Sequence, residues 1–142
     1  EVLNAAVEPA DIVSAVQRRV QFRADRGPDV WSTGKEAWER GYGDCEDIAA
    51  NIVELCTEKG WESWTQVFGL RGMLIGHAVA MGRWNGKLWL DNGSSYTTVD
   101  SLDEARRHVA RQMGWTDIRK VTTTELDKLG MVARNTHSLP LK

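Results

Sequence analysis

The sequence holds little cysteine: Cys45 and Cys56 are the two in a chain of 142 residues. Two cysteines exclude the disulfide framework that stabilises many small secreted domains. Both fall in one predicted helix, where a rise of about 1.5 Å per residue separates them by roughly 16 Å, beyond the reach of a disulfide. We therefore expect two free thiols, and either can be inert or reactive.

The sequence also lacks an excess of charge of one sign and any long hydrophobic run. The net charge is −2, and 18 Lys and Arg residues are scattered among 20 Asp and Glu residues. Without a basic stripe, nucleic acid is not an expected partner. No apolar run approaches the length of a membrane span or resembles a signal-peptide core, so we expect no membrane insertion and leave the compartment open.

What is present is an ordinary globular composition with one unusual count. Hydrophobic residues make up 42% and charged residues 27%, and seven residues are Trp. Most of the Trp side chains are expected in the core or lining a pocket. The length fits one domain over residues 1–142, and no repeat or linker divides it.

Apolar spacing predicts helices in the first half of the chain. One helix is expected over 9–25, ending before Gly27, and one helical turn over 35–40 within a loop over 29–43. A second helix is expected over 45–59, with Asp44 as N-cap and Gly60 just beyond its end.

Strand-like runs follow over 63–70, 73–83, 87–91 and 95–99, and Asn85-Gly86 indicates a hairpin. Ser101 begins another helix, and a strand over 117–122 and a helical turn over 123–129 complete the prediction. Helices followed by antiparallel strands predict an α+β fold, with a central helix packed on an antiparallel sheet.

Cys45 stands at the predicted start of that central helix. The partial positive charge and free N–H groups of a helix N-terminus favour a thiolate and can hold an oxyanion. Asp44, Glu46 and Asp47 crowd the same turn and oppose thiolate formation. Taken alone, such a cysteine is more often a buried structural thiol than a nucleophile.

His77 changes this interpretation. It alternates with Ile75, Val79 and Met81 on the bulky face of a predicted strand. We expect the bulky face to meet the helix, which would point His77 toward Cys45. A histidine facing a cysteine at a helix start is a candidate general base.

The next strand ends at Asp91 and Asn92, and either can orient the imidazole. A two-residue Asn85-Gly86 turn pairs Ala80 with Asp91 and makes Asn92 the diagonal neighbour of His77. A three-residue loop with a bulge at Gly86 pairs Val79 with Asp91 and brings Asp91 to the face of His77. The apolar pattern leaves the two residues close to even.

Four segments together resemble a known family. Trp31-Ser32-Thr33 with Glu36, the stretch GDCEDIA over 43–49, GHAV over 76–79 and LDN over 90–92 are similar to the bacterial transglutaminase-like cysteine proteinases. These are relatives of the periplasmic proteases that clip biofilm adhesins. The similarity covers roughly residues 25 to 100. Gly34 departs from the family pattern, which usually has Pro there, and the chain is shorter than typical members.

The resemblance implies a papain-like or transglutaminase-like fold and a triad of Cys45, His77 and Asp91, which in turn implies the bulged hairpin. In the adhesin-clipping members, acids that flank the cysteine take part in calcium binding. The matching residues here are Asp44 and Glu46. No cofactor is required by this chemistry, and calcium is the one candidate ion.

The implied activity is that of a cysteine peptidase or amide hydrolase that cuts a protein or peptide through a thioester. The backbone N–H of Cys45 and an indole N–H of Trp31 or Trp38 are candidates to hold the oxyanion, with Asn92 near the pocket. Two alternatives stay open: a transglutaminase-type acyltransferase or deamidase, and an inactive domain that binds a protein. Periplasmic, secreted and cytoplasmic locations all stay open, in a bacterium or a phage.

Overall fold

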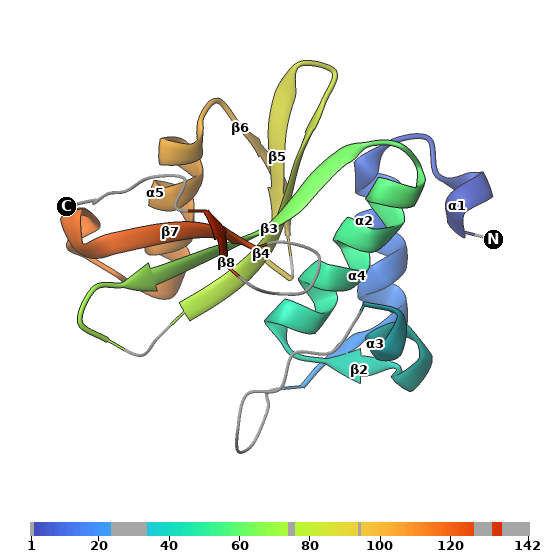
Figure 1. Ribbon diagram of the computed structural model, residues 1–142, viewed down its shortest axis with the longest axis horizontal. Coiled ribbons are helices and arrows are strands. Elements are labelled where there is room, and N and C mark those ends of the chain that lie inside the picture. The colour runs from blue at the N-terminus through green and yellow to red at the C-terminus, as the bar shows by residue number, and fades with distance from the viewer. Residues whose placement is uncertain (1, 24–33, 74–75, 94, 127–131, 135–142) are drawn as a thin grey trace.

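Six strands form one antiparallel sheet in the order β6-β5-β4-β3-β7-β8, and helices cover both of its faces (Figure 1). The computed structural model describes residues 2–23, 34–73, 76–93, 95–126 and 132–134. The strands of the sheet are β3 (Glu62–Leu70), β4 (Gly76–Trp84), β5 (Lys87–Asp91), β6 (Tyr96–Val99), β7 (Val121–Leu126) and β8 (Val132–Arg134). The α+β fold predicted from the sequence is confirmed.

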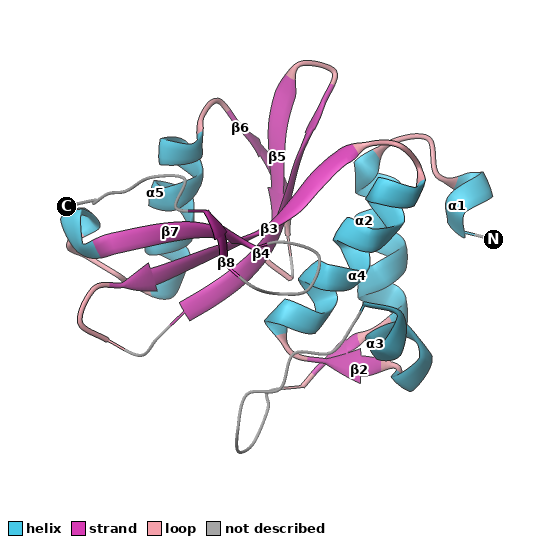
Figure 2. Cartoon of the chain, in the orientation of Figure 1, coloured by secondary structure: helices cyan, strands magenta, loops and turns pink. Residues whose placement is uncertain are grey.

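Most of the helices lie on one side of the sheet (Figure 2). This side carries α1 (Val2–Ala5), α2 (Pro9–Arg19), α3 (Gly34–Arg40) and α4 (Cys45–Glu58), with a small parallel pair of β1 (Gln21–Phe22) and β2 (Tyr42–Gly43). The opposite side carries α5 (Leu102–Met113), which a 3-10 turn, η1 (Ile118–Lys120), connects to β7. None of the helices in the described ranges is long and apolar enough to cross a bilayer.

Local chemistry explains where α4 begins and ends. The Asp44 carboxylate accepts the backbone N–H of Asp47 at 3.2 Å, and the Asp47 carboxylate accepts that of Asp44 at 3.1 Å. This reciprocal capping box satisfies two N–H groups that the first helical turn leaves without partners. Past the other end, Gly60 takes a φ of +87°, a left-handed conformation that glycine adopts at little cost. The predicted cap and stop are both confirmed.

The two faces of β4 differ in side-chain size. Ala80 joins the core that α2 and α4 form, together with Trp89 of β5, whereas Val79 and Met81 join the core beneath α5. The expectation that the bulky face of β4, the face of His77, meets the helix of Cys45 is therefore wrong. Small side chains let a helix approach the strand backbone closely, and the bulky side chains fill the space under the single helix α5.

The β4–β5 hairpin closes through a two-residue turn. Trp84 pairs with Lys87 and Ala80 with Asp91, and the turn residues Asn85 and Gly86 have φ values of 53° and 76°. These positive φ angles are those of a type I′ turn, whose twist suits a hairpin. The bulged loop implied by the resemblance is therefore wrong, and Asp91 lies on the face of Ala80.

Two further element predictions need correction. The first helix ends at Arg19, because the Gln21 N–H bonds to the Gly41 carbonyl at 3.0 Å and the chain turns into β1. Near the other end, 118–120 is a 3-10 turn and 121–126 is strand, where a strand over 117–122 and a helical turn over 123–129 were predicted. Residues 127–129 lie outside the described ranges. Pairing with β3 overrides the weak local helix signal of this segment.

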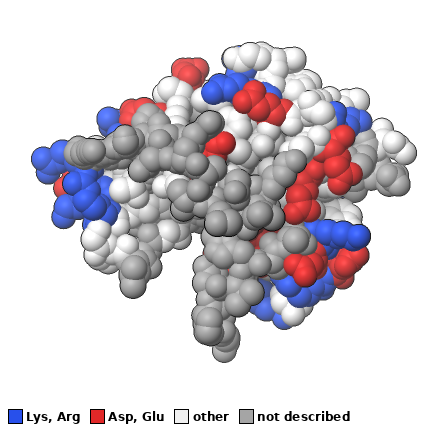
Figure 3. Space-filling view, viewed as in Figure 1, with Lys and Arg blue, Asp and Glu red and all other residues white. Residues whose placement is uncertain are grey.

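Acidic and basic side chains are intermingled over the helical half of the face drawn in Figure 3. Ion pairs among the described residues include Arg40 with Asp47 at 3.2 Å and, on strands β4 and β3, Arg83 with Glu62 at 3.5 Å. On the face shown, the Lys and Arg side chains of this half that are drawn in blue form no continuous stripe.

Candidate active site

Cys45 is the first residue of α4, and its side chain is half-buried. Two backbone N–H groups hydrogen-bond to its sulfur, those of Ala78 on β4 and of Glu46 in the same helical turn. Ala78 directly follows His77 in the chain, so the thiol lies beside the backbone that carries the candidate base. Close approach of α4 to the small-residue face of β4 makes this contact possible.

The thiol of Cys45 is protonated at neutral pH. Burial raises its pKa to about 11; the Ala78 N–H acts in the opposite direction, and the negative charges of Glu46 and Asp44 raise the pKa further. The opposition of these acids to a thiolate, expected from the sequence, thus holds in the structure. A nucleophile in this state needs a base to remove its proton.

His77 occupies the second position of β4 and is half-buried. Its Nε2 lies 3.1 Å from the backbone carbonyl oxygen of Asn92. Burial lowers the pKa of the imidazole, and the Asn92 carbonyl acts in the opposite direction. The ring is therefore neutral at pH 7 and able to accept a proton.

Asp91 is the last residue of β5 and is 1% exposed. Its carboxylate accepts the side-chain amide of Gln17 at 2.8 and 3.0 Å, and the backbone N–H of Gly93 at 3.1 Å. Burial raises the pKa of Asp91 to about 6, while the bonds from Gly93 and Gln17 act in the opposite direction. The group is thus mainly ionised at neutral pH.

Among the described residues, no hydrogen bond joins the His77 ring to the Asp91 carboxylate. The third position next to the imidazole is held by the Asn92 backbone, and the Asn92 side-chain oxygen accepts the Ser95 N–H at 2.9 Å. Of the two candidates that the sequence left close to even, Asn92 contacts the imidazole through its main chain, and the Asp91 side chain accepts the N–H of the next peptide.

Of the two tryptophan candidates for an oxyanion site, Trp38 lies among the residues that the structure describes. Trp38 lies on α3 and packs against the core of α2 and α4, with the Arg19 guanidinium 5.7 Å from its ring centre. Its contacts explain it as a core residue. Trp31 lies outside the described residues.

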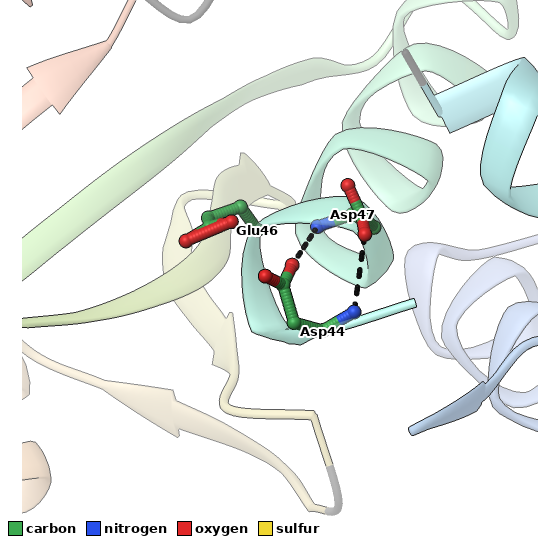
Figure 4. A group of neighbouring side chains, drawn as sticks. All are labelled: Asp44, Glu46 and Asp47. Atoms are coloured by element: carbon green, nitrogen blue, oxygen red, sulfur yellow. Dashed lines mark hydrogen bonds between the residues drawn. The ribbon is translucent and has the colours of Figure 1, made fainter. Parts of the chain in front are cut away.

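Three carboxylates gather at the start of α4, those of Asp44, Glu46 and Asp47 (Figure 4). Each offers one oxygen, and these oxygens lie within 4.8 Å of one another. Calcium binds oxygen ligands at about 2.3–2.6 Å, so oxygens up to roughly 5 Å apart can share one ion. The donor set and its spacing fit calcium.

The Arg40 guanidinium contributes a positive charge to this cluster. It lies 3.2 Å from the Asp47 Oδ2, which also accepts the Asp44 N–H. Asp44 and Glu46 are the two ligand candidates that the sequence predicted. Asp47 was expected only to add negative charge beside the thiol, although an acid three residues after Asp44 on a helix returns to the same side. Gln17 was missed altogether, and nothing in its local sequence could have indicated it.

Sequence comparisons found no match: no family model matches the chain, and no characterised protein matches it. A comparison of structures did find a similar fold. Calcium-bound LapG from Legionella pneumophila superposes with a TM-score of 0.56 at 16% sequence identity, over 92% of this chain and 72% of LapG. The chain therefore has the transglutaminase-like fold.

Proposed function

We propose that this protein is a cysteine peptidase or amide hydrolase of the transglutaminase-like type, with a protein or peptide as substrate. Cys45 is the nucleophile, His77 the general base and Asp91 the acid that supports the base. One observation carries the proposal. The thiol at the start of α4 meets the backbone N–H of Ala78, the residue that follows His77, and the His77 Nε2 lies 3.1 Å from the Asn92 carbonyl. The fold likeness to calcium-bound LapG supports it.

The reaction begins with a neutral pair. His77 removes the proton of the Cys45 thiol, and the sulfur attacks the carbonyl carbon of the substrate amide. The carbonyl oxygen becomes an oxyanion, for which N–H groups at the start of α4 are donors. The protonated His77 then gives its proton to the leaving amine as the carbon–nitrogen bond breaks, and a thioester remains.

Water completes the cycle. His77 accepts a proton from water, whose oxygen attacks the thioester carbonyl, and the carbon–sulfur bond breaks to release the acid and return the thiol. An acyltransferase or deamidase would share every step up to the thioester. An acyltransferase would pass the acyl group to an amine in place of water, whereas a deamidase would use water after attack on a glutamine side-chain amide.

We also propose that Asp44, Glu46 and Asp47 bind calcium. A bound divalent cation would neutralise the carboxylates that raise the pKa of the Cys45 thiol. Asp44 and Glu46 are the two ligands that the resemblance implies, and Asp47, whose Oδ2 pairs with Arg40, is the third candidate. Asp44 also acts as the N-cap, because one of its oxygens accepts the Asp47 N–H.

A reactive ester tests the hydrolase proposal without knowledge of the natural substrate. We expect p-nitrophenyl acetate to acylate wild-type protein with a burst of nitrophenolate, and peptide mapping to locate the acetyl group on Cys45. Cys56 is the matched control, because it is a free thiol on the same helix that is fully buried.

The alternative of a binding domain without catalysis has one observation in its favour, the burial that keeps the Cys45 thiol protonated. Iodoacetamide separates the two proposals. If Cys45 of the native protein reacts only after unfolding, the protein is a binding module and the hydrolase proposal fails. Modification of Cys45 but not Cys56 in the native state, lost in His77→Ala, supports the hydrolase.

A further inference from the structure

One peptide group lies between the acid and the base of the site. The N–H of Gly93 bonds to Asp91 Oδ2 at 3.1 Å, and the carbonyl of Asn92 lies 3.1 Å from His77 Nε2. This N–H and this carbonyl belong to the same peptide unit. The two groups of a trans peptide point in opposite directions, so the unit reaches the carboxylate with one and the imidazole with the other.

The carbonyl contact fixes the tautomer of His77. A carbonyl oxygen only accepts hydrogen bonds, so the neutral ring carries its proton on Nε2 and donates it to Asn92. Nδ1 is then the nitrogen with a free electron pair. The bond from the Gly93 N–H to Asp91 also polarises the Asn92–Gly93 peptide, which makes its carbonyl a stronger acceptor for the His77 ring.

Gln17 supplies the other partner of the carboxylate. Its side-chain Nε2 donates to Asp91 Oδ1 at 2.8 Å and to Oδ2 at 3.0 Å, across 74 residues of sequence. An ionised carboxylate buried to this degree is costly unless donors surround it. Gln17 is the side-chain donor from α2 that meets this need, and Gly93 is the main-chain donor.

The conformation of Gly93 completes the arrangement. Its φ is +102°, in the region that side chains disfavour, and a Cβ placed on it would meet no other atom within 4 Å. A side chain at Gly93 would therefore act through backbone strain alone. Such strain would rotate the peptide that joins Asp91 to His77.

We propose that Gln17 is a positioning residue, which holds the Asp91 carboxylate so that the Asn92–Gly93 peptide fixes His77 with its proton on Nε2. The inference rests on the proposed hydrolase function and deepens it. It assigns the support of the base to a chain of contacts from Gln17 through Asp91 and one peptide group, in place of a direct bond between carboxylate and imidazole.

The experiment compares two isosteric variants, Gln17→Met and Gln66→Met. Gln66 is fully buried; its amide N–H donates to Thr123 Oγ1 at 2.6 Å and its amide oxygen accepts the Trp64 indole N–H at 2.8 Å, on the face of the sheet opposite Asp91. Both variants lose side-chain hydrogen bonds of a glutamine amide. Only Gln17→Met is expected to lower kcat for p-nitrophenyl acetate, by roughly tenfold, with KM unchanged.

Nitrogen-15 NMR of His77 gives the readout that a merely structural role would not move. In wild type and in Gln66→Met, we expect the ring shifts of a single tautomer with the proton on Nε2. In Gln17→Met, we expect averaged shifts that indicate both tautomers. Unchanged His77 shifts in a folded Gln17→Met protein would overturn the proposal.

A second variant keeps the test decisive if Gln17→Met does not fold. Gly93→Ala should also mix the tautomers, whereas Gly86→Ala, with a φ of +76° and open space at the other end of the hairpin, should strain the backbone without effect on His77. Unchanged His77 shifts in Gly93→Ala would refute the peptide connection. Failure of the hydrolase function is a different result: wild type would then show no turnover, while the tautomer measurement would still stand.

Discussion

Ala80 lies directly opposite Asp91 in the β4–β5 ladder, and both residues face the layer that contains α2 and α4. The Asp91 carboxylate is therefore on the side of the sheet that α4 covers. Gln17 on α2 donates to it, while the His77 imidazole contacts the peptide that follows Asp91.

Loss of the nucleophile should abolish turnover without loss of the fold. Cys45→Ser is expected to reduce ester hydrolysis on the order of 10³-fold or more, because a serine hydroxyl is a weaker acid and a poorer nucleophile than a thiol. The circular dichroism spectrum should change little. Cys56→Ser should do the reverse: a hydroxyl in the core lowers the free energy of unfolding by about 1–2 kcal/mol and leaves turnover intact. Full activity in Cys45→Ser would remove the cysteine from the mechanism.

Asp91 should make the stability depend on pH in one direction. Its pKa is about 6 in the folded protein against 3.8 for an unperturbed Asp, so the folded state binds more protons between these values. Stability from this group is therefore lost as pH rises from about 4 to 6, by up to about 3 kcal/mol. Urea unfolding across this range should show the loss in wild type but not in Asp91→Asn. Parallel curves for the two proteins would contradict the raised pKa.

His77 should titrate below its ordinary value. Burial lowers its pKa from 6.5, so the acid limb of kcat/KM is expected below pH 6.5 and to follow the NMR titration of the same ring. The folded state disfavours the charged ring, so the contribution of this group to stability falls as pH drops below 6.5. An acid limb above pH 6.5 would assign the activity to another group.

Calcium should stabilise the protein through the acids at the start of α4. We expect calcium to raise Tm and calorimetry to give one binding site, and Glu46→Gln to weaken binding at least roughly tenfold by the loss of one charged ligand. Asp44→Asn should weaken it similarly while Asn retains the N-cap. Glu62→Gln is the control, since this exposed acid pairs with Arg83 on the β3–β4 pair. Equal calcium affinity in all four proteins would exclude the cluster as the site.

Gly82 should be intolerant of any side chain. A Cβ at this position would overlap the Glu62 carbonyl and the Trp89 ring, so Gly82→Ala is expected to lower the free energy of unfolding by about 1–3 kcal/mol or more. Gly60→Ala, where a Cβ meets no atom within 4 Å, isolates the cost of a positive φ, which we expect near 1 kcal/mol. Chemical denaturation measures both, and a smaller effect at Gly82 would contradict the close packing of Trp89.

Local signals predicted those parts of the fold that local chemistry determines. The capping acids of α4, Gly60 after it and the Asn85-Gly86 turn all act within a few residues, so the sequence alone could place them. The side of the sheet that α4 covers depends instead on the packing of distant helices. The alternation along β4 shows only that its two faces differ, and both faces turn out to be buried.

The site divides in the same way. Cys45 and the acids beside it could be proposed as a site from the sequence because a helix start has recognisable chemistry, and Cys45 is indeed the first residue of α4. The contact of Gln17 with Asp91 joins residues from α2 and the end of β5, and no spacing rule connects two such positions. The role of the Asn92 carbonyl could not be predicted either, because a backbone atom leaves no trace in residue identity.

The small side chains of Ala78 and Ala80 have a consequence for how the Cys45 thiol is placed. They let α4 approach β4 until the Cys45 sulfur meets a main-chain N–H, which every residue except proline possesses. The position of the thiol thus depends on a limit on side-chain volume along one strand face, and not on the identity of a neighbouring side chain.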